Sequence, residues 1–407
     1  MNKEALQKLR ERAVAILLSC ASPLGFLASA RADGYPQVWA RDSMVVALAV
    51  LATGHPRLQA AAKRSIVTLA QHQDDLGWIP TNVQLRTHRP DRTTPGAVDS
   101  NSWWIIGLGT YVRLMGDRVL KKRLWGNVEQ ALAWLHYQDQ NRDGLLELQE
   151  AADWEDLLAI RGTGLTVNVL YAQALKTAAA LAPSEKRRKA LRALFENTRQ
   201  RINRQLWITP SSQRVRRDIN LDIPQWRGAH LVAHQQGFSP PYYLPYYTMW
   251  QYGRWFDSLG NLLAIVTGVA SRQRARALLR FMAQHKLAHP FPTKAIYPPL
   301  RPGESDWREY YRKYRLNLPH RYHNGGIWPM IGGWHVLALA KIGERRAASR
   351  LFLRLAAANR ATDFNEWLHG KTGKPSGMKE QAWSAGMFLL ADHVLRTGRA
   401  VFSAYRK

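Results

Sequence analysis

A single carboxylate beside a pair of tryptophans is the first feature of this sequence that could do chemistry. Asp99 ends a polar loop, and the chain continues into an apolar stretch that contains Trp103 and Trp104. A carboxyl group among large aromatic side chains can protonate a leaving oxygen, and the rings offer flat faces to a sugar. Taken alone, the segment is more simply an Asp that caps a helix before a core-facing Trp pair. The rest of the chain has to separate these two interpretations.

Similar polar loops recur along the chain, each ahead of an apolar segment. Any one of them is commonplace, because Asp and Asn cap helices and Trp fills cores. Their recurrence predicts that the loops meet at one end of a repeated structure, where a ligand site is expected. The loops are Trp39-Ala40-Arg41-Asp42, Val98-Asp99-Ser100-Asn101, Ala152-Asp153-Trp154-Glu155-Asp156, Trp255-Phe256-Asp257, Arg321-Tyr322-His323-Asn324, Phe364-Asn365-Glu366-Trp367 and Gln381-Ala382-Trp383.

Some of these side chains have a structural interpretation of equal or greater weight. Arg41 and Asp42 could form a buried ion pair as readily as they could bind sugar hydroxyls. A histidine such as His323 is more often a hydrogen-bonded structural residue than a catalyst. Asp153, Glu155 and Asp156 are rival carboxylates, to which we give a binding or positioning role.

The elements that must position these loops are helices. Helical periodicity predicts twelve segments that alternate in character, six apolar nearly all round and six amphipathic and basic. Because a helix that is apolar on all sides must be enclosed by protein, the pattern predicts an all-α fold, the (α/α)6 toroidal barrel of six helical hairpins, as one domain over residues 1–407. Two stretches rich in proline and aromatic residues predict irregular, lid-like excursions at about 207–256 and 287–322.

Charge and cysteine content restrict the partners and the compartment. A net charge of +28, from 58 Lys and Arg against 30 Asp and Glu, makes polyanion binding a rival hypothesis. The basic clusters fall between the apolar segments without a nucleic-acid motif, so a solvated basic surface is the simpler interpretation. The single cysteine, Cys20, suits the cytoplasm. We expect the protein to bind no specific nucleic acid and to contain no membrane span. The sequence leaves open whether it forms a homo-oligomer.

The N-terminal segment allows two interpretations. Basic residues followed by the apolar run 13–30 resemble a signal peptide. Pro23 and Gly25 interrupt that run, and the same residues make a good first helix at about 3–19. We favour the structural helix.

A calcium-loop pattern is the one cofactor signal in the chain. Asp139, Asn141, Asp143 and Gly144, followed by Glu150, match the EF-hand loop. The residues after Glu150 look like a loop rather than an exiting helix, so a tight turn is the simpler interpretation and a structural calcium ion the alternative. The sequence has no phosphate loop, dinucleotide fingerprint or Cys/His cluster, and no other cofactor or metal is expected.

Taken jointly, five motifs resemble the alkaline/neutral invertases, a family of glycoside hydrolases. More broadly, they resemble the bacterial (α/α)6 glucosidases related to amylo-α-1,6-glucosidases and glycogen-debranching enzymes. The resemblance runs from about residue 35 to about residue 395. The motifs are Trp39-Ala40-Arg41-Asp42, Val98-Asp99-Ser100 with Trp103-Trp104, Phe256-Asp257-Ser258-Leu259-Gly260-Asn261, Arg321-Tyr322-His323-Asn324-Gly325-Gly326 with Trp328-Pro329, and Gln381-Ala382-Trp383.

The resemblance implies roles for individual residues. It places the general acid on Asp99 and the second carboxylate on Glu366, although Asn365 and Trp367 replace the family's Pro and Tyr. It also places Arg41, Asp42, His323, Asn324, Gln381 and Trp383 around the bound sugar. We add Trp39, Trp104, Asp153, Trp154 and Glu155 as further substrate-binding candidates.

These roles predict a two-carboxylate mechanism. Desolvation beside Trp103 and Trp104 would raise the pKa of Asp99 and keep it protonated. An ionised Glu366 would activate a water molecule and give inversion. The expected function is hydrolysis of a terminal hexose from a small glycoside, with sucrose favoured. The alternatives are an α-glucosidase or debranching-type amylo-α-1,6-glucosidase and, from another class, a non-catalytic carbohydrate-binding protein.

Overall fold

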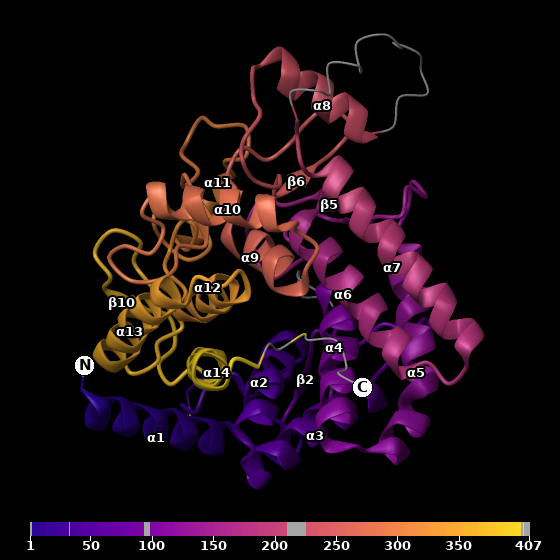
Figure 1. The fold of residues 1–407 in the computed structure, drawn as a ribbon, viewed down its shortest axis with the longest axis vertical. Coiled ribbons are helices and arrows are strands. Elements are labelled where there is room, and N and C mark those ends of the chain that lie inside the picture. Colours follow the sequence, from indigo (N-terminus) through magenta and orange to yellow (C-terminus); the bar gives the residue numbers. More distant parts are fainter. Residues whose placement is uncertain (1, 32, 93–97, 210–224, 400–401, 403–407) are drawn as a thin grey trace.

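The helices predicted to be apolar on all sides form a closed inner ring. The computed structural model describes residues 2–31, 33–92, 98–209, 225–399 and 402. Within these residues, each ring helix packs on the next and the last packs on the first (Figure 1). Nearly every ring residue is buried, as its apolar circumference requires. The ring helices are α2 (Ala40–Thr53), α4 (Val98–Met115), α6 (Leu165–Leu181), α9 (Ser258–Thr267), α12 (Pro329–Lys341) and α14 (Ala382–Thr397).

Amphipathic helices surround this ring, and several of them, such as α13 between α12 and α14, pack on two neighbouring inner helices. The outer helices are α3 (Pro56–Gln71), α5 (Arg118–Tyr137), α7 (Glu185–Gln205), α10 (Arg272–Gln284), α13 (Arg345–Thr362) and α1 (Lys3–Cys20). The first five follow their inner partners in the chain, whereas α1 packs on α14 and completes the sixth pair. The predicted (α/α)6 barrel is therefore confirmed.

The expected first helix is present as α1. Asn2 caps it by accepting a hydrogen bond from the amide of Ala5, and the face containing Leu9, Ile16 and Leu17 is buried. Arg10 donates two hydrogen bonds, of 3.0 and 2.7 Å, to the carboxylate of Asp392 on α14. These contacts make α1 part of the barrel.

Short antiparallel strands lie in the loops at the entrance to the ring. β1 (Gln37–Trp39), β5 (Gly162–Gly164) and β7 (Phe256–Asp257) run directly into α2, α6 and α9. In the described part of the chain the sheets have the orders β1-β2-β3, β4-β5-β6, β7-β8 and β10-β9. The other strands are β2 (Asn82–Gln84), β3 (Pro90–Asp91), β4 (Glu147–Leu148), β6 (Tyr246–Tyr247), β8 (Ile296–Tyr297), β9 (Trp367–Leu368) and β10 (Pro375–Ser376).

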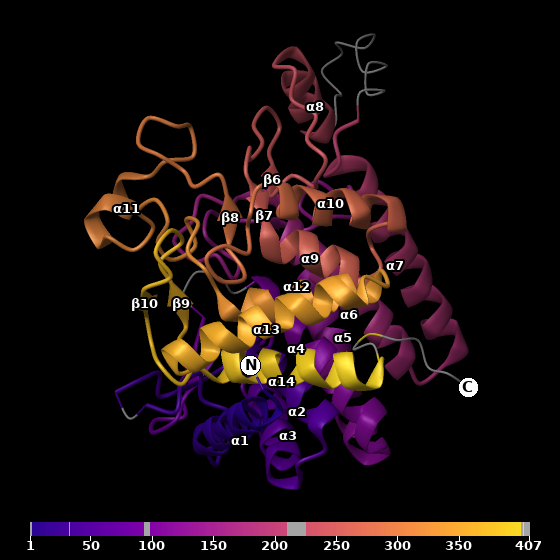
Figure 2. The ribbon, with the colours of Figure 1, turned by 60° about the vertical axis from the view of Figure 1, so that its left-hand side comes forward.

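The two proline-rich excursions contain more regular structure than the sequence predicts. The stretch 207–256 contains α8 (Gln225–Gln235) and β6, and its residues 210–224 lie outside the described residues. The stretch 287–322 contains β8 and α11 (Glu309–Tyr314). Figure 2 shows α11 and the strands β8 to β10 at one end of the ring. Among the described residues, no helix is long and apolar enough to cross a membrane.

Candidate active site

A pocket at the strand-bearing end of the ring collects side chains from several of the predicted loops. The pocket has a volume of about 420 Å³, which includes space open to solvent. The predicted residues Trp39, Arg41, Asp42, Trp154, His323, Glu366, Gln381 and Trp383 line it, together with Ala28, Tyr35, Asp156, Tyr322 and Trp328. The sequence thus predicted most of the lining, from loops that lie far apart along the chain.

Aromatic rings form one wall of the pocket. Trp154 packs edge-on against Trp328, with ring centroids 5.5 Å apart, and Trp328 packs edge-on against Trp383 at 5.7 Å. His323 stacks on Trp328 at 5.0 Å. Rings held in this way give a rigid apolar surface on which a pyranose ring can lie.

Several polar atoms of the lining have no protein partner. Among the described residues, the indole Nε1 atoms of Trp39, Trp154 and Trp383 and the Oε1 atom of Gln381 are buried without a hydrogen bond. Such groups are rare in folded proteins because each one loses its bond to water. Three N–H donors and one acceptor around a single pocket suit a ligand rich in hydroxyl groups.

Glu366 is a buried pocket carboxylate held in one orientation. The hydroxyl of Tyr35 donates to Oε1 and Oε2 at 3.2 and 3.3 Å, and the backbone amide of Met378 donates to Oε2 at 3.0 Å. Gly377, at φ +72°, allows this approach, because a Cβ atom there would lie 2.4 Å from Oε2. Burial raises the pKa of Glu366 to about 7.

Asp156 and Asp42 are the other carboxylates that line the pocket. The hydroxyl of Tyr322 donates to Oδ1 of Asp156 at 3.1 Å. Burial raises the pKa of Asp156 to about 6, although the charge of Arg41 opposes the shift. Burial raises the pKa of Asp42, in the first turn of α2, to about 7, again against Arg41. The three carboxyls therefore titrate close to neutral pH.

Asp99 does not line the pocket. Its side chain is fully buried and accepts two hydrogen bonds from the guanidinium of Arg41, from Nε at 2.6 Å and from Nη2 at 3.1 Å. This bidentate contact occupies both carboxylate oxygens, so neither is free to meet a ligand in the pocket. The expected buried ion pair of Arg41 is thus present, but its partner is Asp99 rather than Asp42.

Four further predicted binding residues lie outside the lining. Trp104 is in the core, where its Nε1 donates to the carbonyl of Ile66 at 3.0 Å. Asn324 holds the backbone of the loop that contains it, accepting from the amide of Leu300 at 2.6 Å and donating to the carbonyl of the same residue at 2.9 Å. Asp153 and Glu155 are fully buried. Trp104 and Asn324 therefore have structural contacts in place of the expected sugar contacts.

The buried acids Asp153 and Glu155 lie in a strongly desolvated part of the core. Oδ1 of Asp153 accepts from the amide of Glu155 at 2.8 Å, whereas both carboxylate oxygens of Glu155 lack a partner among the described residues. Burial raises the pKa of Asp153 to about 8, and that of Glu155 well above its ordinary value. Burial therefore favours the protonated form of both side chains.

His323 is neutral. Burial lowers its pKa to about 3, and its Nδ1 lies 3.0 Å from the backbone carbonyl of Asp156. This fits the structural interpretation of the residue and leaves Nε2 as the ring atom able to meet a ligand.

The described residues contain no group of three or more His, Cys, Asp or Glu arranged to hold a metal ion. In the calcium-like loop, Asp139, Asn141 and Asp143 accept hydrogen bonds from the amides of Gly144, Asp143 and Leu145. Glu150 pairs with Arg308 instead. This geometry favours the tight turn.

Comparisons with known proteins show similarity to the alkaline/neutral invertases. A family model described as alkaline and neutral invertase matches residues 249–398. The probable alkaline/neutral invertase F of Arabidopsis thaliana is 25% identical over 424 residues, covering 89% of this chain and 81% of the relative. The chloroplastic neutral/alkaline invertase 3 of Oryza sativa subsp. japonica is 24% identical over 461 residues, covering 96% and 73%.

Solved structures with the same fold include glycosidases. A GH63 mannosylglycerate hydrolase from Thermus thermophilus, in complex with glucose, superposes with a TM-score of 0.65 at 15% identity, covering 94% of this chain and 99% of that chain. A rhamnosidase from Klebsiella oxytoca with rhamnose bound gives a TM-score of 0.65 at 14% identity, covering 98% and 65%. The comparisons confirm the resemblance to the alkaline/neutral invertases and support a glycoside hydrolase.

Proposed function

We propose that this glycoside hydrolase removes a terminal hexose from a small glycoside, with Asp156 and Glu366 as its catalytic carboxyls and sucrose as the first substrate to test. The observation that carries the proposal is the pocket itself. It brings the buried carboxyl of Glu366 and the half-buried carboxyl of Asp156 together with an aromatic wall and with the unpartnered N–H groups of Trp39, Trp154 and Trp383. Similarity to invertases supports the choice of sucrose.

Glu366 is the better candidate for the general base. Its two donors, Tyr35 and Met378, bind the ionised form and fix the direction of the carboxylate. In an inverting reaction such a carboxylate takes a proton from water as the water attacks the anomeric carbon. We infer inversion, so the first sugar released should have the opposite anomeric configuration to the substrate.

Asp156 replaces Asp99 as our candidate for the proton donor. It lines the pocket, and its side chain accepts a hydrogen bond from one neutral donor, Tyr322, whereas Asp99 is bound by a guanidinium. Because Asp42, Asp156 and Glu366 share a desolvated pocket, ionising all three near neutral pH is unfavourable. A proton therefore remains available among them. We give Asp42 the role of binding a sugar hydroxyl.

The decisive experiment is a substrate panel. Purified protein is incubated with sucrose, trehalose, maltose, isomaltose, maltooligosaccharides and glucosylglycerate, and released sugars and their anomers are followed by NMR. Asp156→Asn and Glu366→Gln should abolish release from the preferred glycoside while folding normally, and the exposed Asp75→Asn should act like the wild type. Full activity in either pocket variant would refute the assignment.

The panel also separates the alternatives. Release from maltose, isomaltose or maltooligosaccharides with sucrose untouched would indicate the α-glucosidase or debranching-type activity. Sugar binding without release from any member of the panel would indicate the carbohydrate-binding protein. Tight binding of nucleic acid that falls steeply with salt, without sugar release, would indicate that the net charge of +28 serves a polyanion.

A further inference from the structure

The loop that contains Asp156 is held from outside by a segment distant in sequence. We define the acid loop as residues 149–161, between β4 and β5, and the cover segment as residues 300–324, which includes α11. The acid loop closes on itself through the hydrogen bond from the amide of Ala151 to the carbonyl of Ile160, of 2.9 Å. This hydrogen bond ties together the two ends of the loop that contains Asp156.

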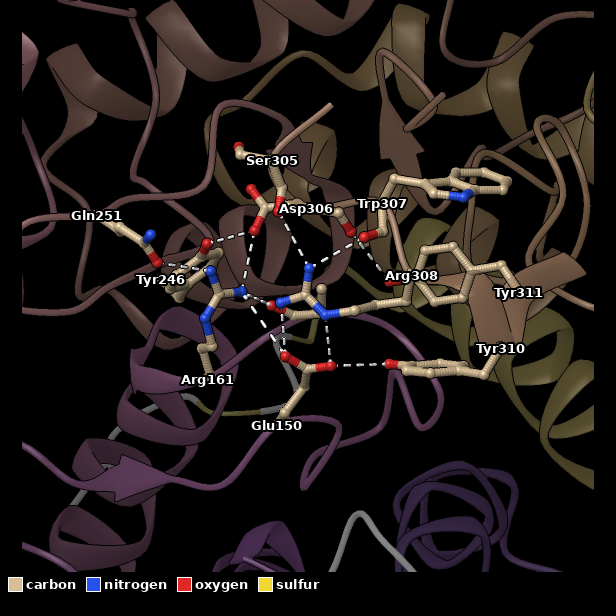
Figure 3. A network of polar contacts seen from close by, with 11 residues as sticks. Glu150, Arg161, Tyr246, Gln251, Ser305, Asp306, Trp307, Arg308, Tyr310 and Tyr311 are labelled. Carbon is tan, nitrogen blue, oxygen red and sulfur yellow. Dashed lines mark hydrogen bonds and ion pairs between the residues drawn. The ribbon is translucent and has the colours of Figure 1, made fainter. Parts of the chain in front are cut away.

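A network of ion pairs joins the two segments (Figure 3). Arg308 donates to both carboxylate oxygens of Glu150, at 2.8 and 2.7 Å, and the hydroxyl of Tyr310 donates to the same carboxylate at 3.1 Å. Arg161, at the other end of the acid loop, donates to Asp306 at 2.9 Å. The cover segment thus holds both ends of the acid loop.

A third segment, residues 246–251, which begins with β6, adds hydrogen bonds to the contact between Arg161 and Asp306. The hydroxyl of Tyr246 donates to the same oxygen of Asp306 at 2.6 Å, and Arg161 also donates to Gln251 at 2.9 Å. The guanidinium carbon of Arg161 lies 4.7 Å from the centre of the Tyr246 ring. Figure 3 shows the side chains of all three segments converging on one point.

Polar contacts also tie the cover segment to the middle of the acid loop. Asn317 donates to the carbonyl of Leu157 at 2.7 Å. Tyr322 donates to the carboxylate of Asp156, and Nδ1 of His323 lies 3.0 Å from its carbonyl. Within α11, Tyr311 is the buried side chain, and Tyr310 is partly buried against the core.

We propose that Glu150, Arg161, Asp306 and Arg308 are positioning residues that hold the acid loop against the cover segment and so fix where the Asp156 carboxyl meets the substrate. This inference rests on the proposed role of Asp156. The four residues are not part of the pocket lining. They act through the loop backbone, because a small misplacement of a catalytic group is enough to slow a reaction.

The test compares three arginine variants on the preferred glycoside of the panel. Arg308→Ala removes the contact to Glu150, Arg308→Lys keeps the charge without the bidentate geometry, and Arg312→Ala is the matched control. Arg312 lies on the same helix, but its pair with Glu309 is exposed, at 63% and 73% of the two side chains. Steady-state kinetics and hydrogen–deuterium exchange of peptides from 149–161 are measured for each.

We expect Arg308→Ala to lower kcat by about 10- to 100-fold, with KM little changed and faster exchange confined to the acid loop and cover segment. Arg308→Lys should recover part of kcat, and Arg312→Ala should match the wild type in both measurements. If Arg308→Ala fails to fold, Glu150→Gln tests the same contact with less disturbance. Wild-type kcat together with wild-type exchange in the variant that folds would overturn the proposal.

Hydrogen–deuterium exchange distinguishes a failure of this inference from a failure of the proposed function. If the wild type releases no sugar from any glycoside, the proposed function fails. Faster exchange of 149–161 in Arg308→Ala, but not in Arg312→Ala, would then still show that the network holds the loop. Unchanged exchange would refute the network as a positioning device, whether or not the protein hydrolyses glycosides.

Discussion

Replacing Asp99 with asparagine distinguishes a buried ion pair from a catalytic acid. The Asp99 side chain is fully buried, that of Arg41 is 10% exposed, and two hydrogen bonds of 2.6 and 3.1 Å join them. Removing one partner of a buried pair costs about 3–5 kcal/mol, because the other charge is left uncompensated. Asp42 and Asp156 also stabilise the charge of Arg41. We therefore expect the lower end of that range, about 3 kcal/mol.

A loss of this size is measurable without abolishing the fold, since domains of ordinary stability have about 5–15 kcal/mol. Urea unfolding of Asp99→Asn should show the loss directly. Combining it with Arg41→Met should restore part of it, because the double variant no longer buries an unpaired charge. Equal stability of Asp99→Asn and the wild type would refute the ion-pair interpretation.

Activity on two leaving groups then tests the proton donor. A glycosyl fluoride needs little acid assistance, whereas a sugar leaving group needs a proton. Asp156→Asn should lose most activity on the natural glycoside but keep much of it on the fluoride. Asp99→Asn should lose both activities in the same proportion, because it disturbs the position of Arg41 rather than proton transfer. Selective retention of fluoride hydrolysis by Asp99→Asn would return the acid to Asp99.

Three further predictions follow from the buried carboxyls and the calcium-like loop. Burial raises the pKa of Asp156, the proposed acid, to about 6 and that of Glu366, the proposed base, to about 7. The productive form, with Asp156 protonated and Glu366 ionised, is then the less populated of the two singly protonated forms. The profile of kcat/KM should still be bell-shaped, with limbs near these values, which belong to the pair. Activity falls at low pH as the base is protonated and at high pH as the acid loses its proton; a flat profile from pH 5 to pH 8 would contradict this. Burial raises the pKa of Glu155, so the folded state keeps a proton that the unfolded state releases. The free energy of unfolding should then fall as pH rises above the ordinary glutamate pKa, and Glu155→Gln should reduce that fall in urea titrations at pH 5 and pH 8; equal slopes would contradict it. Because Asp139 accepts a backbone hydrogen bond and Glu150 pairs with Arg308, a chelator should leave Tm unchanged, and a drop in Tm that added calcium reverses would establish a calcium site.

The barrel was predictable because the apolar pattern that indicates an inner helix extends over the whole length of each helix. A helix such as α4, in which Val98 to Val112 are all buried, has apolar residues on every side, and a ring enclosed by other helices satisfies that composition. The short strands gave little signal, because two or three residues do not establish a period. The helix α8 was missed for a related reason: Gln225–Gln235 contains no proline, but prolines on both sides of it made the whole stretch look irregular.

The pocket lining was predictable from the recurrence of polar loops, but the role of each carboxylate was not. Asp99 and Asp156 both belong to the recurring loops that stand ahead of apolar segments, and this pattern does not distinguish them. What separates them is Arg41, which precedes Asp99 by 58 residues and binds it directly at 2.6 Å, whereas the hydrogen bond to the Asp156 side chain comes from Tyr322. Only the crossing of α2 and α4 decides which carboxylate receives the guanidinium. The guanidinium in turn occupies Asp99 and leaves Asp156 to line the pocket, so the packing of two inner helices sets the role of the loop before α6.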